Sequence, residues 1–165
     1  MTVDPIDRLA RLVVGWWALW HYRQRGPAAA IETIRNRGGG GTDSDGTHYQ
    51  WQAEDSGRRI RLTLGDEPTR TYLTRDALDR AAARITETDW AQLDAIVAAR
   101  LAAIHLAFPD RPRPHEPRTP EQEASIRRGH RDISAAEQQA HDLIRAAVAR
   151  TAPRPAEQLG LFATP

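Results

Sequence analysis

The chain has 165 residues and a mass of 18.5 kDa, which suits one domain or one domain with an appendage. Hydrophobic residues make up 40% of the chain and charged residues 27%, so it can bury a core and is not a disordered polymer. All 23 basic residues are arginine, and the chain contains no lysine and no cysteine.

These absences exclude several classes of site. Without lysine the chain has no P-loop, no Schiff-base nucleophile and no kinase-type ATP site. Without cysteine it has no disulfide, no thiolate zinc site and no cysteine nucleophile. No serine lies in a G-x-S-x-G motif, and the histidines lack a metal-ligand spacing such as H-E-x-x-H. We therefore expect a protein that is not an enzyme and that binds no metal and no cofactor.

The charge is balanced along the chain. The formal net charge is +1, with 14 arginines and 14 acidic residues in residues 1–108 and 9 arginines and 8 acidic residues in residues 109–165. Tight non-specific binding to nucleic acid usually requires a clustered basic excess. Neither part of the chain has one.

An apolar run near the N-terminus resembles a targeting signal. It covers residues 12–20, but Asp4 and Asp7 precede it and Arg23 follows it closely, unlike a signal peptide. Nine residues are also too short to span about 30 Å of hydrocarbon. We expect a buried core helix in a cytoplasmic protein without a membrane contact; the alternative is a helix that lies in a membrane interface through its tryptophans.

The first two predicted helices are separated by Gly26-Pro27. The first covers residues 4–25, with Asp4 as N-cap, Pro5 in the first turn and apolar residues around most of its surface. Such a helix belongs in the centre of a fold or in an interface. The second covers residues 27–37 and is followed by a glycine-rich loop over residues 38–46.

Strands are predicted next, because apolar residues then alternate with polar ones. The alternation covers residues 48–53 and 59–64, with a turn at Asp55-Ser56-Gly57 between them. A third strand is expected over residues 70–73. Together they predict a three-stranded antiparallel meander with one buried face.

Helices return in the second half of the chain. One is expected over residues 74–85, and a longer one over residues 88–108 with Thr88 as its N-cap. The apolar face of the longer helix contains Trp90, Leu93, Val97, Leu101, Ile104 and Phe108. A short helix begins at Thr119-Pro120, and the capping box Ser134–Glu137 opens another helix that ends near residue 150.

The sequence thus predicts an α+β fold in which helices surround a small antiparallel sheet. The expected organisation is a globular body over residues 1–108 and a linker rich in proline and arginine over residues 109–120. A helical segment over residues 121–150 and a disordered tail over residues 151–165 follow.

The tail contains an unusual apolar cluster. Three large apolar residues, Leu159, Leu161 and Phe162, lie in a span of four residues inside the proline-rich C-terminal segment. Large apolar side chains are not expected there unless a pocket binds them. The pocket belongs either to a partner or to this protein's own core. In the second case the tail folds back as a strap, against which the spacer with Pro153 and Pro155 argues.

The sequence Gln158-Leu159-Gly160-Leu161-Phe162 resembles the Q-L-[SD]-L-F motif by which bacterial replication and repair proteins bind the sliding clamp, the ring-shaped β subunit of the replicative polymerase. The resemblance covers these five residues only. It implies polar contacts from Gln158 at the pocket edge, Leu159 in one subsite, and Leu161 with Phe162 in the deep subsite. Gly160 departs from the usual serine or aspartate at the most permissive position.

Two other functions remain open. The order of helix, loop and β-hairpin is similar to that of a winged helix, and a DNA contact would then involve the arginines of the second helix and of the hairpin turn: Arg35, Arg37, Arg58, Arg59 and Arg61. A solvated hairpin face beside Glu54 and Asp55 is the plainer interpretation. The second alternative is a helix-rich interaction subunit whose tryptophan-rich first helix packs on a partner.

Overall fold

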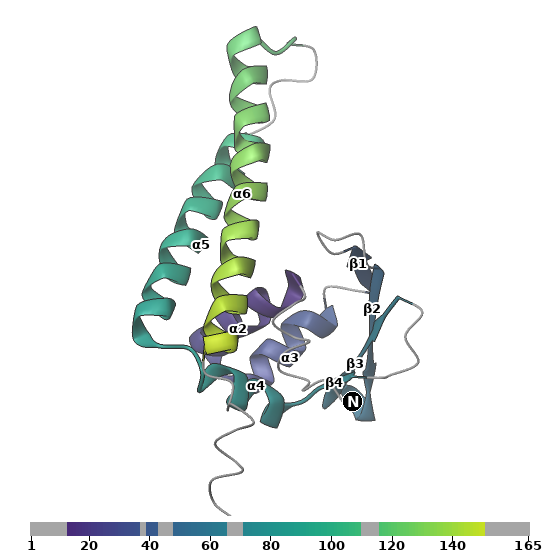
Figure 1. The fold of residues 1–165 in the computed structure, drawn as a ribbon. Coiled ribbons are helices and arrows are strands. Elements are labelled where there is room, and N and C mark those ends of the chain that lie inside the picture. Colours follow the sequence, from purple (N-terminus) through teal and green to yellow (C-terminus); the bar gives the residue numbers. More distant parts are fainter. Residues whose placement is uncertain (1–12, 37–38, 43–47, 66–70, 110–115, 151–165) are drawn as a thin grey trace, which may run out of the picture.

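The computed structural model describes residues 13–36, 39–42, 48–65, 71–109 and 116–150. In this part of the chain, helices lie beside an antiparallel sheet, as the α+β prediction requires. Figure 1 shows α2, α3 and α4 between the sheet and a long arm formed by α5 and α6. The predicted start of the first helix at Asp4 and Pro5 lies outside the described residues.

The sheet has four strands among the described residues, one more than predicted. These are β1 Gly40–Thr42, β2 His48–Glu54, β3 Arg59–Leu64 and β4 Thr71–Leu73, in the order β1-β2-β3-β4. The loop prediction for residues 38–46 is therefore wrong at β1. Glycine permits a strand here, because a Cβ at Gly41 would lie only 2.7 Å from the hydroxyl oxygen of Tyr49 on β2 and would prevent the close pairing.

One face of the sheet packs on α3 Pro27–Asn36. Tyr49, Ile60 and Leu62 are buried on this face, whereas His48, Gln50 and Gln52 on β2 are exposed. The alternation follows from the two-residue period of a strand. The indole Nε1 of Trp51 donates a hydrogen bond of 3.2 Å to the carbonyl oxygen of Ile34 on α3, which ties the sheet to the helix.

Helix α2 Val13–Arg25 lies in the centre of the body, between α3, α4 Arg75–Ala82 and the arm. Trp16 and Leu19 are buried in the core, which confirms the prediction of a core helix at these positions. Gly26 separates α2 from α3 with a φ of +90°, a conformation that favours glycine. The hydroxyl of Tyr22 on α2 donates a 2.7 Å hydrogen bond to Asp79 on α4.

The N-cap of helix α5 Glu87–Ala107 lies two residues before the predicted one. Thr86, and not Thr88, is its N-cap, because the Thr86 hydroxyl accepts a hydrogen bond from the Asp89 N–H while Asp89 Oδ2 accepts one from the Thr86 N–H. This reciprocal arrangement is a capping box with aspartate in the third position. The spacing distinguishes the two threonines, because Thr86 has an aspartate three residues later whereas Thr88 has Ala91, which cannot return the bond.

Helix α6 Pro120–Arg150 is one continuous helix of 31 residues, and the prediction of two helices is wrong here. Its start agrees with the predicted one at Pro120, where the Thr119 hydroxyl accepts a hydrogen bond from the Gln122 N–H. Ser134 lies inside the helix and its hydroxyl donates to the carbonyl oxygen of His130, at 3.2 Å. A serine that bonds one turn back in this way is compatible with a helix interior, so Ser134 does not open a new helix.

Three contacts along its length hold α6 against α5. Near the tip of the arm, Gly129 brings the helices so close that a Cβ would lie 2.5 Å from the Ala107 nitrogen and 2.8 Å from the Ala103 oxygen. In the middle, Arg100 donates two hydrogen bonds of 3.0 and 2.8 Å to Glu137 Oε1. At the base, an ion pair joins the last residue of α6 to the first turn of α5.

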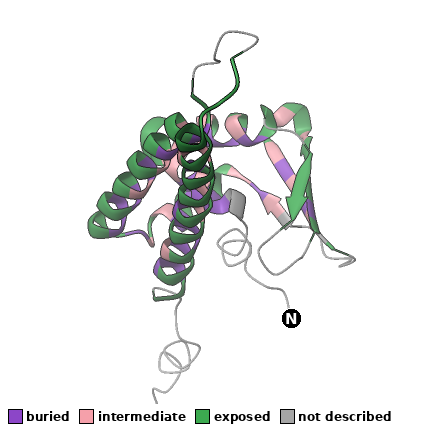
Figure 2. Cartoon of the chain, turned by 90° about the horizontal axis from the view of Figure 1, so that it is seen from above, coloured by how far each residue is buried: buried purple, intermediate pink, exposed green. Residues whose placement is uncertain are grey.

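The segment predicted over residues 121–150 shares the hydrophobic core of the body. Ala140, Ile144, Ala147 and Val148 belong to the same buried cluster as Trp16 and Leu19. Figure 2 shows buried residues where the helices meet and exposed ones on their outer sides. Half of the predicted linker, residues 110–115, lies outside the described residues.

The close contact at Gly129 can be tested by substitution. We expect Gly129→Leu to lower the free energy of unfolding by roughly 2 kcal/mol, because the larger side chain forces α6 away from α5. Ala135→Leu, at an exposed position of the same helix, is the matched control. Urea denaturation followed by circular dichroism measures both; equal stabilities of the two variants would contradict the proposed role of Gly129.

Candidate functional site

The predicted partner-binding residues lie in the tail. Gln158, Leu159, Gly160, Leu161 and Phe162 are all outside the described residues, as is the whole segment 151–165. What the structure describes is the residue to which this segment is attached, Arg150, at the end of α6. The described part of the candidate site therefore consists of the surroundings of Arg150.

The attachment point, Arg150, is bound to a buried carboxylate through one guanidinium nitrogen. The Arg150 guanidinium donates through Nη2 to both carboxylate oxygens of Asp89, each at 2.7 Å. The Thr86 hydroxyl donates to Asp89 Oδ2 at 2.8 Å. Asp89 is 3% exposed, so its charge depends on these donors.

The pKa of Asp89 reflects two opposing effects. Burial of the carboxylate by itself raises the pKa, but the hydrogen bonds from Arg150 and Thr86 outweigh it and hold the pKa below its usual value. Asp89 therefore stays ionised in the folded protein. The ion pair fixes the last turn of α6 to the first turn of α5, so Arg150, the last described residue, has a defined position.

The predicted DNA-contacting arginines are largely paired with acids. Arg59 lies 2.9 Å from Asp55 and 3.4 Å from Glu54, and its guanidinium lies 4.5 Å from the centre of the Tyr72 ring. Arg61 lies 3.2 Å from Glu54. These contacts neutralise the side of the hairpin that a DNA backbone would have to approach.

The other arginines of that prediction do not extend it into a basic patch. Arg35 lies 3.7 Å from Glu32 on the same helix, Arg58 is exposed beside the hairpin turn, and Arg37 is outside the described residues. The structure thus brings helix α3 and the hairpin together but gives them no uncompensated cluster of arginines in the described part of the chain. DNA binding stays a prediction without structural support.

The tryptophans of α2 form an aromatic cluster that faces the arm. Trp16 and Trp17 meet edge to face with ring centres 5.2 Å apart, and Trp17 stacks on Trp20 at 6.0 Å. The Arg100 guanidinium of α5 lies 5.8 and 5.5 Å from the Trp16 and Trp17 rings. Because Arg100 also binds Glu137 on α6, the cluster joins α2 to the arm, which is a structural role within this molecule.

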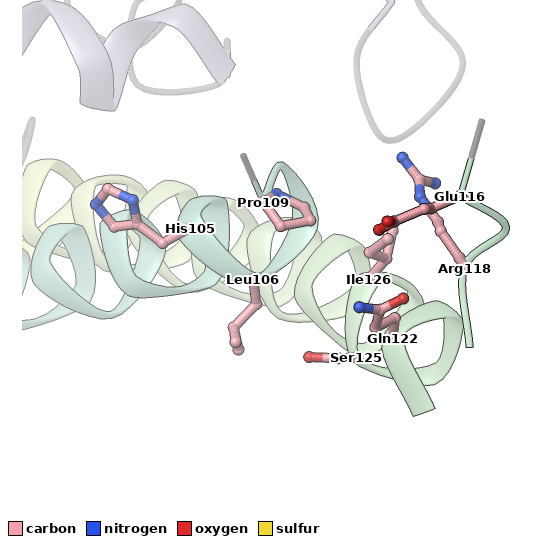
Figure 3. Close-up of a pocket in the computed structure, with 8 residues that line it drawn as sticks. All are labelled: His105, Leu106, Pro109, Glu116, Arg118, Gln122, Ser125 and Ile126. Carbon is pink, nitrogen blue, oxygen red and sulfur yellow. The ribbon is translucent and has the colours of Figure 1, made fainter. Parts of the chain in front are cut away.

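A cavity of about 390 Å³ lies at the junction of the end of α5 and the start of α6. It is lined by His105, Leu106, Pro109, Glu116, Arg118, Gln122, Ser125 and Ile126. Figure 3 shows the His105 ring at one end of this cavity and the Glu116 and Arg118 side chains at the other. The sequence did not predict this cavity, because the residues that line it come from the end of one helix and from the start of the next, on both sides of residues 110–115.

Two further findings concern metals and membranes. Among the described residues, no three histidine, aspartate or glutamate side chains come close enough together to hold a metal ion. In the same part of the chain, one helix, α5, is long and apolar enough to cross a membrane by length and composition. Only 28% of its most apolar window is buried within the molecule.

Comparisons with protein-family models, curated proteins and solved structures found no match to this chain.

The anchor of the tail can be tested through its pH dependence. We expect Arg150→Ala to lower the free energy of unfolding by about 2 kcal/mol at neutral pH, because a buried carboxylate loses two charge-assisted hydrogen bonds. The pKa of Asp89 is lowered by folding. Its stabilisation is thus complete above the unfolded value of about 3.9 and is lost as the pH falls through the folded value.

The difference between wild type and Arg150→Ala should therefore shrink below about pH 4. Arg145→Ala, at an exposed position of the same helix, is the matched control, and chemical denaturation at several pH values is the measurement. A difference of constant size between pH 7 and pH 3 would contradict the assignment to Asp89.

Proposed function

We propose that this protein is a non-enzymatic accessory protein that binds the bacterial sliding clamp through its C-terminal peptide. The observation that carries the proposal is the sequence Gln158-Leu159-Gly160-Leu161-Phe162. It resembles the clamp-binding motif at four defining positions and departs from it only at Gly160. Such binding places the protein in DNA replication, DNA repair or the biology of mobile elements.

The physical chemistry of the peptide supports this proposal. Burial of a leucine or phenylalanine side chain contributes roughly 1.5–3 kcal/mol, and the peptide offers three such residues. Part of that gain is spent on ordering the segment. We expect a net binding free energy of about −8 kcal/mol, which corresponds to a micromolar dissociation constant.

The attachment of the tail also suits a peptide ligand. Arg150 is held at the base of the arm by Asp89, and Gln158 follows it by eight residues that include Pro153 and Pro155. A proline-rich segment extends about 3 Å per residue. The motif can therefore reach roughly 25 Å from the fixed end of α6, which is enough for docking without a contact between the body and the ring.

The proposal predicts that the full-length protein binds a purified bacterial clamp with micromolar affinity. The double substitution Leu161→Ala and Phe162→Ala should abolish binding, because it removes the two side chains assigned to the deep subsite. Isothermal titration is the measurement, and the double substitution Thr151→Ala and Thr164→Ala in the same tail is the matched control. Binding of both double variants with the wild-type constant would refute the proposal.

The same titration distinguishes a free tail from a strap. A peptide of residues 152–165 and the full-length protein should bind one clamp pocket with similar affinity if the tail is free. A tail held by its own body would make the full-length protein much weaker than the peptide.

The departure at Gly160 gives a second prediction. Gly160→Ser should tighten clamp binding by about two- to fivefold, because serine loses less backbone freedom than glycine when the peptide becomes ordered. Titration of wild-type and substituted peptides measures this ratio. Weaker binding by the serine peptide would show that the clamp requires glycine at this position and would argue against the motif assignment.

A further inference from the structure

The solvent side of α5 is apolar over most of its length. Between Ala95 and Leu106, every exposed residue of this helix except His105 is alanine or leucine. Leu101 is 50% exposed, Leu106 37%, and Phe108 at the C-cap 65%. A surface helix normally carries polar and charged residues on this side, and a contiguous apolar surface of this kind indicates a binding partner.

Helix α6 provides an internal comparison, because it belongs to the same arm. Its exposed side is strongly charged, with Arg127, Arg128, Arg131, Asp132, Asp142 and Arg145. The arm therefore has one helix with an ordinary solvated face and one without. The difference lies in α5 and is not a general feature of the composition of the arm.

The exposed residues of α5 include a complete heptad pattern. Five of them follow one another at alternating steps of three and four residues and form the outer seam of α5: Ala91, Asp94, Ala98, Leu101 and His105. This spacing keeps side chains in line along one side of a helix, as in coiled coils. All five residues are exposed. Phe108 follows the last helical residue, and its ring meets that of His130 on α6 at 5.1 Å, so it is not part of the outer seam.

The position of the outer seam suits a four-helix bundle. Each of its residues directly follows a residue of the inner seam, which packs against α6 and the body: Trp90, Leu93, Val97, Arg100, Ile104 and Ala107. Adjacent residues differ by about 100° around a helix, close to the angle between the two neighbours of a helix in a four-helix bundle. Figure 1 shows α5 on the side of the molecule away from the sheet, where a second arm has access.

The outer seam is complementary to itself when read in opposite directions. With two copies antiparallel and centred between Ala99 and Arg100, each Leu101 faces Ala98 of the other copy. In two further layers Asp94 faces His105, an acid opposite a base. Large residues thus meet small ones and charges are matched, as self-association through a two-fold axis requires.

We propose that the protein forms an antiparallel dimer through the outer seam of α5, so that the two arms make a four-helix bundle. The small side chain of Ala98 lets the helices approach closely, and the Leu101 side chain of the other copy fills the space beside it. Within the described part of the chain, Asp94 and His105 make no hydrogen bond or ion pair. Both are therefore available for the contact between copies. The inference does not depend on what the tail binds.

A second copy fits this surface better than a lipid bilayer does. Alanine contributes little to partition into a membrane but favours close helix packing. The outer seam also carries Asp94, and arginines that would bind anionic lipid headgroups are absent from its exposed residues. Spanning would bring the charged face of α6 into the hydrocarbon, because α6 is held to α5 by Arg100–Glu137 and Asp89–Arg150.

The test is the molar mass of the full-length protein by sedimentation equilibrium. We expect the wild type to have twice 18.5 kDa at micromolar concentration and Leu101→Asp to be a monomer, because it places a carboxylate against the apolar seam of the other copy. Ala135→Asp on the exposed side of α6 is the matched control and should stay dimeric. Circular dichroism establishes that all three proteins are folded.

A charge exchange tests the register. His105→Asp places two carboxylates opposite each other in two layers of the dimer, and we expect the dissociation constant to rise by about tenfold or more. The additional substitution Asp94→Arg restores opposite charges in both layers. It should return the constant to within about threefold of the wild-type value, the coupling expected for residues in contact.

Two outcomes would overturn the inference. One is a wild-type protein that stays monomeric at high micromolar concentration. This outcome includes a monomeric protein that binds phosphatidylglycerol vesicles in a flotation assay and loses that binding on substitution of Leu101. The other is a dimer that Leu101→Asp leaves intact, which would place the contact elsewhere on the molecule. A dimer that dissociates with His105→Asp and is not restored by Asp94→Arg would refute the antiparallel register.

Discussion

The structure depends on the close packing of α6 along α5. A glycine near the tip, the Arg100–Glu137 pair in the middle and the Asp89–Arg150 pair at the base hold the two helices in one alignment. The middle contact also involves the body, because Arg100 lies against the Trp16 and Trp17 rings of α2. An arginine so placed lets a polar bond between two helices lie next to an aromatic core, since its guanidinium meets the ring faces and a carboxylate at once.

This alignment of α5 and α6 has two consequences for the surface of the molecule. It determines which side of α5 is covered, and therefore that the alternating positions from Ala91 to His105 face solvent. It also fixes the end of α6 at Asp89, and so the point after which the segment proposed to bind the clamp begins. A change in the packing of the arm would alter both the outer seam and the origin of the tail. The arm is thus the element that relates the two proposed interactions to each other.

The sequence predicted the α+β class, the central part of the sheet and most helix boundaries, because these depend on local periods of two and of 3.6 residues. The sequence-based predictions were wrong where contacts between residues distant in the sequence determine which side chains are buried. The sequence places the apolar residues from Trp90 to Phe108 on one face of the helix, but only those in the first half are fully buried, and Leu101 is 50% exposed. The spacing of apolar residues is the same for a side of a helix that is buried in the core and for an adjacent side that is exposed, so it does not distinguish the two.

The candidate sites show the same division. The tail motif is visible in the sequence because it is five consecutive residues, whereas Asp89 and Arg150 are 61 residues apart and no local pattern relates them.

The two proposed interactions are geometrically compatible with each other. In the proposed antiparallel dimer the bases of the two arms lie at opposite ends of the bundle, roughly 30 Å apart along its axis, and a tail extended from each base would add about 25 Å. A partner that carries more than one copy of the proposed pocket would bind the second tail at a high effective concentration, because that tail is already held nearby. The weak affinity expected of one short peptide is therefore compatible with stable attachment of the whole protein.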